Sequence, residues 1–315
     1  MFGRRAISAA VLVLVAACSP SESTTSAVPT TVAPTTTAAA AFPVTVAGDN
    51  GQVTIEERPV AIVSLSPTAT ESLFAIGAGD QVIAVDDRSD YPAEAPVSEL
   101  SGFTPNVEAI AALRPDLVVI SFDPGDLVSG LNAVGIPVLM QDAAATLDEA
   151  YDQIEQLGIA TGNGDEAGQV VAGMQGEIEA IVVANPPTDP PLTYYHELGP
   201  ELYSLTSSTF AGSIYSLLGL QNIADPADAD GAAFGYPQLS AEFIVEADPD
   251  LIFLADTICC QQNEAAVKER PGWDTLTAVN EGGVVELNDD VASRWGPRIV
   301  DFLQSVADGV AAKAG

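Results

Sequence analysis

The chain has 315 residues, of which 44 are Asp or Glu and only 10 are Lys or Arg, so its formal net charge is −34. This charge excludes nucleic acid as a natural partner, because phosphate binding needs clustered basic side chains. The single histidine, His196, excludes zinc sites built from two or three imidazoles, and a Ser-His-Asp triad would have to use it. The hydrophobic fraction of 47% is enough for full cores in one large or two medium domains.

The N-terminal region has the pattern of an exported protein. Two arginines precede an apolar run at 6–17, which is too short for the roughly 20 residues that span a bilayer, so residues 1–17 are predicted to be a signal peptide. The small residues before Cys18 resemble a lipobox, so we expect Cys18 to carry a lipid anchor at the outer face of the cell membrane. An ordinary signal peptide is the alternative. Residues 18–41 are almost only Ser, Thr, Ala, Pro and Val, a composition that predicts a disordered tether.

From residue 42 onward, short β-rich runs alternate with helical patterns. In the first half these segments are 61–65, 68–76, 81–85, 106–113, 116–121, 127–134 and 137–141. A similar series in the second half comprises 192–197, 210–218, 241–247, 250–254, 273–279, 284–287 and 297–312. Alternation of this kind indicates βα units with largely parallel sheets. We therefore predict an α/β fold with two Rossmann-like lobes, the first at 42–164 and the second at 186–315.

Residues 165–185 are predicted to form a single long helix between the lobes. Asn185 is followed by two prolines, which end a helix because proline cannot continue its hydrogen-bond ladder and restricts the preceding residue. The apolar side chains repeat at the spacing of one helix face, at Val171, Met174, Ile178, Ile181 and Val182.

Motifs for catalysis are scarce. The sequence contains no GxxxxGK[ST] loop and no GxSxG elbow, so we do not predict an enzyme, and a hydrolase using His196 is the competing hypothesis. His196 lies at the end of a predicted strand, as either a buried residue bonded to a neighbour or a ligand contact. Cys259 and Cys260 are adjacent, and the oxidising surroundings of an exported protein favour a vicinal disulfide. Two free thiols or a soft-metal site are the alternatives.

Two of the few arginines occupy informative positions. Arg88 and Arg294 both lie just beyond predicted strands, at the strand ends where open α/β sheets bind ligands. A guanidinium beside an aromatic ring, as at Arg294 and Trp295, suits planar, carboxylated or metal-chelated ligands. We expect both arginines to contact a ligand, and pairing with one of the many acids is the alternative.

Eight short motifs together resemble the iron-siderophore and vitamin B12 class of periplasmic binding proteins. They lie at 58–59, 62–71 (IVSLSPTATE), 89–92 (SDYP), 113–118 (LRPDLV), 236–242 (YPQLSAE), 247–252 (ADPDLI), 270–273 (RPGW) and 293–298 (SRWGPR). The resemblance covers residue 58 to the C-terminus. It implies a ligand cleft between two lobes bridged by one helix, and a monomer that delivers a small-molecule metal chelate to an ABC permease and its ATPase. Gram-positive members are lipoproteins, in agreement with Cys18.

The resemblance also implies roles for individual residues. Glu71 and Glu242 match glutamates that the class presents to permease arginines, one on the upper surface of each lobe. The residues expected to bind ligand are Arg88, Phe103, Tyr195, Tyr203, Tyr236, Arg294 and Trp295, with Ser207, Thr209 and Phe210 as further candidates.

The expected ligand follows from the charge of these residues. The cationic cleft favours a ferric siderophore as the iron chelate over cobalamin, which is the alternative. Haem also stays open, because His196 with Tyr195 or Tyr203 could ligate its iron. No resident cofactor or metal is predicted. A cell-wall scaffold protein is the alternative outside the transport class.

Overall fold

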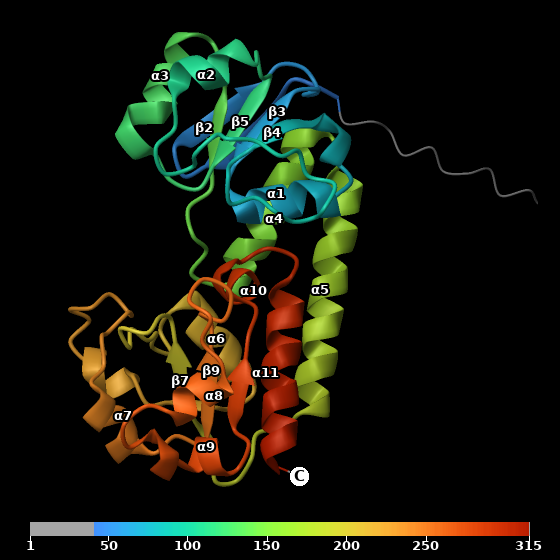
Figure 1. Ribbon diagram of the computed structural model, residues 1–315. Helices are drawn as coiled ribbons and strands as arrows, with labels where there is room; N and C mark the ends of the chain where they lie inside the picture. The colour runs from blue at the N-terminus through green and yellow to red at the C-terminus, as the bar shows by residue number, and fades with distance from the viewer. Residues whose placement is uncertain (1–40, 315) are drawn as a thin grey trace, which may run out of the picture. The chain divides into compact units, whose positions relative to one another are not determined.

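The structure, a computed structural model, describes residues 41–314. The predicted signal peptide, Cys18 and residues 18–40 of the predicted tether lie outside the described residues. Within this range the chain forms two four-stranded parallel sheets and a two-stranded antiparallel hairpin of β1 (Val44–Gly48) and β2 (Gly51–Ile55) (Figure 1). The predicted α/β fold with two lobes is confirmed. Among residues 41–314, we find no helix with the length and apolarity to cross a membrane.

The first lobe is built on a sheet with the order β4-β3-β5-β6. Its strands are β3 (Ile62–Leu65), β4 (Val82–Val85), β5 (Leu117–Ile120) and β6 (Val138–Met140). Every residue of β3 and β5 is buried, because helices cover both faces of the sheet. One face packs on α2 (Val107–Ala112) and α3 (Leu127–Ala133), and the other on α1 (Pro67–Ala75) and α4 (Leu147–Thr161). The sequence analysis missed α4 and the hairpin.

The second lobe contains a sheet with the order β10-β9-β7-β8. Its strands are β7 (Thr193–Glu197), β8 (Gln221–Asn222), β9 (Leu251–Leu254) and β10 (Val284–Glu286). The helices are α6 (Phe210–Leu217), α7 (Ala241–Ala247), α8 (Glu264–Lys268), α9 (Thr277–Asn280), α10 (Asp289–Ser293) and α11 (Ile299–Ala314). Short 3-10 turns lie at Gly79–Gln81, Pro124–Asp126, Asp225–Asp228 and Trp273–Thr275. The helix expected at 273–279 is interrupted, because Leu276 has extended backbone angles.

Helix α5 (Gly164–Ala184) follows the first lobe and precedes the second (Figure 1). Helix α5 packs against α4 of the first lobe and against α11 of the second. Five of its side chains are buried. They are Ala167, Val171, Met174, Ile178 and Ile181, which is the face expected from the apolar spacing.

The two lobes repeat one topology. Read from its other edge, the second sheet has the order β8-β7-β9-β10, which matches β4-β3-β5-β6 strand for strand. Residues 106–120 and 240–254 also correspond: Asn106 and Ser240 cap α2 and α7 by accepting from the backbone N–H three residues on. Asp116 and Asp250 each accept backbone N–H bonds at the start of the neighbouring strand. This repeat lets positions in one lobe be compared with positions in the other.

Candidate functional site

The carboxyl ends of both parallel sheets open onto a pair of adjoining hollows, of about 430 and 370 Å³, which we call the cleft. The first hollow is lined by residues that follow β3, β4 and β5, and the second by Leu198 and Ala255, which follow β7 and β9. Ser293 and Trp295 line both hollows. Ligands of open α/β sheets bind beyond the carboxyl ends of the strands, so the cleft is the candidate ligand site.

Exposed aromatic rings dominate the cleft walls. Phe103 is 68% exposed and lies with its ring centre 5.6 Å from that of Phe122 in the first hollow. In the second hollow Phe234 is 89% exposed and Tyr236 is half exposed. Phe103 and Tyr236 were predicted, whereas Phe122 and Phe234 were missed. An aromatic residue two positions beyond a buried strand, as at Phe122, is the signal that could have found the first of these.

Arg88 lies in the first hollow with an exposed side chain. Its backbone N–H donates to Asp86 at 2.9 Å, which turns the chain at the end of β4. Within the described residues its guanidinium forms no ion pair, so it is available to an anionic group of a ligand.

Arg294 borders the cleft, but both terminal nitrogens of its guanidinium are hydrogen-bonded within the protein, which corrects the expectation of a second free cation for the ligand. Its side chain is only 8% exposed. One guanidinium nitrogen donates to Glu71 at 2.6 Å, and the other donates to Asp290 at 2.8 Å and to the carbonyl of Arg88 at 3.0 Å. A buried guanidinium requires such acceptors, so the alternative of pairing with acids holds.

Trp295 stands between the two hollows. Its indole N–H donates to the side-chain oxygen of Gln153 on α4 at 2.8 Å, which fixes the orientation of the ring. Trp295, one of the residues predicted to bind ligand, thus lines both hollows with a fixed ring.

Glu71 is not on the surface, which corrects the expectation of an exposed carboxylate at this position. It is 3% exposed and accepts hydrogen bonds from both Arg294 and Arg298. The lobe repeat gives the reason. Glu71 is the fifth residue after the cap of α1, Ser66, and the fifth residue after the equivalent cap of α6, Thr209, is the fully buried Ile214. This position on the helix faces inward in both lobes.

Glu242 is exposed in the first turn of α7, as a docking residue must be. Its first-lobe counterpart is Glu108, because both glutamates lie two residues after the cap of equivalent helices. Glu108 is also exposed. The sequence analysis missed this residue, and the repeat of a cap, a glutamate and a later Pro-Asp-Leu in residues 106–117 and 240–251 is the signal that identifies it.

Tyr195 and His196 are both fully buried in β7, which corrects the assignment of Tyr195 to the ligand site and agrees with the alternative of a buried His196 bonded to a neighbour. Tyr195 packs edge-on against Trp273, with ring centres 6.1 Å apart. The Nδ1 atom of His196 is bonded to the hydroxyl of Tyr215 at 2.7 Å, and burial lowers the pKa of His196 to about 3. Both faces of the central strand are covered by helices, so neither side chain can reach iron in the cleft.

Of the remaining second-lobe candidates, two line the cleft and two do not. Thr209 and Phe210 line the second hollow, and Thr209 also caps α6. Ser207 is turned to Asp225, which accepts from its N–H and its hydroxyl. Tyr203 is half exposed, but it pairs with Gln238 in a β-bridge and is absent from the residues that line the two hollows.

Cys259 and Cys260 are bonded to each other in an exposed loop after β9. The carboxylate of Asp289, in the first turn of α10, accepts from the backbone N–H groups of Thr257 and Cys259 at 2.8 Å each. The disulfide loop is thereby attached to α10, which lines the cleft.

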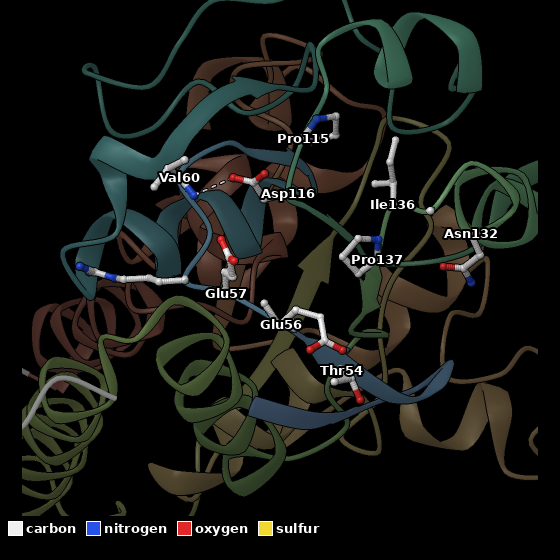
Figure 2. A pocket seen from close by; sticks show the side chains of 12 residues that line it. Thr54, Glu56, Glu57, Val60, Pro115, Asp116, Asn132, Ile136 and Pro137 are labelled. Carbon is white, nitrogen blue, oxygen red and sulfur yellow. Dashed lines mark hydrogen bonds between the residues drawn. The ribbon is translucent and has the colours of Figure 1, made fainter. Parts of the chain in front are cut away.

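A third hollow, of about 690 Å³, lies at the other end of the first sheet from the cleft (Figure 2). Glu56, Glu57 and Asp116 border it, and Asp116 accepts the backbone N–H of Val60 at 2.9 Å. This hollow is at the amino ends of the strands, where the fold does not place ligands. Among residues 41–314 no group of three or more His, Cys, Asp or Glu is arranged to hold a metal ion.

The profile of the family described as periplasmic binding protein matches residues 62–291 of this chain. The chain belongs to this family. It is 31% identical over 279 residues to the ABC transporter substrate-binding lipoprotein YvrC of Bacillus subtilis, covering 85% of this chain and 86% of the relative. It is 33% identical to the cobalamin-binding protein of Halobacterium salinarum, covering 85% of this chain and 74% of the relative.

Among solved structures, the periplasmic vitamin B12-binding protein of Vibrio cholerae resembles this member of the family with a TM-score of 0.67 and 27% identity. The match covers 82% of this chain and 98% of that protein. The family and the two-lobed fold expected from the sequence motifs are therefore confirmed.

Proposed function

We propose that the protein is a lipid-anchored substrate-binding protein of an ABC importer, and that its ligand is a corrinoid of the cobalamin type. The observation that carries this proposal is the set of exposed aromatic rings around Trp295 in a cleft with one unpaired arginine, Arg88. A corrin macrocycle offers large flat surfaces for such rings and needs little cationic charge. The relatives named as cobalamin- and vitamin B12-binding proteins add support.

This choice reverses the preference for a ferric siderophore that the sequence analysis stated. That preference depended on two free arginines, and Arg294 is bound to Glu71 and Asp290. Arg88 is the observation that keeps an anionic ferric siderophore as the second candidate, because an exposed guanidinium binds carboxylate or catecholate oxygens well. Haem ligation through His196 is not proposed, because the ring is buried.

We further infer that the permease contacts Glu108 and Glu242. Both carboxylates are exposed in the first turns of equivalent helices, one in each lobe. Their placement suits charge-assisted hydrogen bonds to arginines of a partner. One such contact from each lobe would fix the orientation of the protein on the permease. Glu242 keeps its predicted role, and Glu108 takes the place of Glu71.

Thermal unfolding of the purified protein with cyanocobalamin, the anionic tricatecholate ferric enterobactin, or haemin tests the ligand. A ligand at 100 times its dissociation constant adds about 2.7 kcal/mol to the free energy of unfolding. We expect cyanocobalamin to give the largest shift. A larger shift with ferric enterobactin would favour the second candidate, and no shift with any chelate would contradict the receptor function.

A further inference from the structure

Five charged side chains from distant parts of the chain meet beside the cleft. Glu71 lies on α1 and Asp90 follows β4, whereas Asp290, Arg294 and Arg298 belong to the segment that connects β10 to α11. We call these five residues the inter-lobe ion cluster, because the first two belong to the first lobe and the last three to the second. Glu71 and Arg294 are 223 positions apart in the sequence.

Glu71 is the central acceptor of this cluster. Its Oε1 atom accepts from Arg294 at 2.6 Å and from Arg298 at 2.5 Å, and its Oε2 atom accepts from Arg298 at 2.9 Å. Asp90 is 68% exposed and 3.3 Å from Arg294, so it forms a weaker contact. Asp290 lies on α10, one turn before Arg294, and so cannot connect the two lobes. Glu71 therefore provides the buried charged link between them, beside the neutral bonds of Arg294 to the carbonyl of Arg88 and of Trp295 to Gln153.

The residues held by Glu71 adjoin the wall that separates the two hollows of the cleft, which is made by Ser293 and Trp295. Arg294 and Arg298 flank Trp295 in a stretch between α10 and α11. Gly296 lies against α1, since a Cβ atom there would be 3.4 Å from the side chain and the carbonyl of Thr68. The guanidinium of Arg298 also lies over the ring of Tyr91, 4.0 Å from its centre.

These contacts should affect ligand binding through the conformation of the cleft wall more than through the free energy of folding. A buried ion pair often contributes little to the free energy of folding compared with apolar residues of the same size, but its directional bonds define one arrangement. Residues 294–298 connect two helices, and the bonds of Arg294 and Arg298 to Glu71 restrain this connection together with the bond of the Trp295 indole to Gln153. A preformed wall lowers the entropy lost when a ligand binds.

We propose that Glu71 is a positioning residue for ligand binding: it does not contact the ligand, but through Arg294 and Arg298 it holds Trp295 and the cleft wall in the arrangement that receives the ligand. This inference rests on the proposed function of the cleft. It assigns Glu71 a role inside the protein in place of the surface role that the sequence motif implied.

Calorimetric titration of the wild type and Glu71→Gln with cyanocobalamin, and with ferric enterobactin as the second probe, tests the proposal. The amide keeps the size of the side chain but removes the charge that holds both guanidiniums, so we expect affinity for the chelate that the wild type binds to fall about tenfold or more. Glu155→Gln is the matched control, because Glu155 is an exposed glutamate on the neighbouring helix α4. It should bind as the wild type does.

A second readout separates positioning from a merely structural role. Acrylamide quenching of tryptophan fluorescence without ligand should increase in Glu71→Gln, because Trp295 gains mobility while Trp273 stays fully buried. If Glu71→Gln does not fold, Arg298→Gln replaces it in both measurements. This variant removes two of the three hydrogen bonds to Glu71 by a change at a partly exposed position. We expect it to weaken binding and to increase quenching in the same directions.

The outcomes are distinct. A wild type that binds neither chelate would overturn both the proposed function and the role of Glu71. Normal affinity in folded Glu71→Gln, or in Arg298→Gln where the first variant does not fold, would overturn the role of Glu71 alone. A loss of melting temperature with unchanged affinity and quenching would mark the cluster as structural only and would also refute the proposal.

Discussion

Removal of Arg270 should destabilise the second lobe strongly. The Glu197 side chain is fully buried at the end of β7, and both of its oxygens accept from the guanidinium of Arg270 at 2.6 Å. Arg270 also donates to Gln262 at 2.7 Å and lies 4.5 Å from the ring centre of Trp273. Arg270→Met keeps much of the side-chain volume but leaves Glu197 without its cation.

The magnitude follows from the burial of the remaining carboxylate. Breaking a buried ion pair by removing one partner costs about 3–5 kcal/mol, and loss of the contact with Trp273 adds about 0.5–1 kcal/mol. At roughly 2 °C per kcal/mol for a protein of this size, the melting temperature should fall by roughly 7–12 °C. Differential scanning calorimetry at neutral pH measures the shift.

Two further variants make this reasoning refutable. Glu197→Met combined with Arg270→Met removes both charges and should recover most of the loss, because the buried carboxylate is gone. Lys268→Met is the control, since Lys268 is an exposed cation of the same lobe that forms no ion pair among the described residues, and such surface substitutions change the free energy of unfolding by less than about 0.5 kcal/mol. The argument is wrong if Arg270→Met loses less than the control, or if the double variant is no more stable than the single one.

Three other predictions concern pH, ligand contact and transport. Burial, and after it the nearby charge of Glu197, raises the pKa of Asp256 to about 7 from 3.8, so between these values the folded state binds more protons than the unfolded state. The free energy of unfolding should therefore fall as pH rises from about 4 to 7, and Asp256→Asn should remove this slope in urea unfolding at pH 5 and pH 8. Phe234→Ala should weaken chelate binding about tenfold with an unchanged melting temperature, because the ring is exposed in the cleft, whereas Val183→Ala on α5 should change neither in calorimetry. Glu108→Lys combined with Glu242→Lys should abolish cellular uptake of the chelate and leave its dissociation constant intact, and a loss of affinity would contradict the docking role.

Much of the cleft's framework could be predicted from the sequence, because it depends on short-range patterns. The predicted β-rich runs at 61–65, 81–85 and 250–254 end where β3, β4 and β9 end, and the run at 116–121 ends one residue beyond β5. Phe103 and Tyr236, predicted to bind ligand, line the cleft. Helix α4 was missed although Thr146 caps it and acids occupy its first turn. Exposure of Phe234 could not be read from the sequence, because it depends on which segments leave the ring uncovered.

The sequence by itself determined the fold class, the two lobes and the helix between them, because periodicity, capping and proline act over fewer than about twenty residues. Only the tertiary structure decided the partners of the few cations. Arg294 meets Glu71 across 223 positions, and no local pattern encodes that encounter. No local pattern encodes the burial of Tyr195 and His196 either, because it depends on helices that cover both faces of β7. In a chain with 44 acids and 10 basic residues, a cation's role depends on which acid lies within hydrogen-bond distance, and folding alone sets that distance.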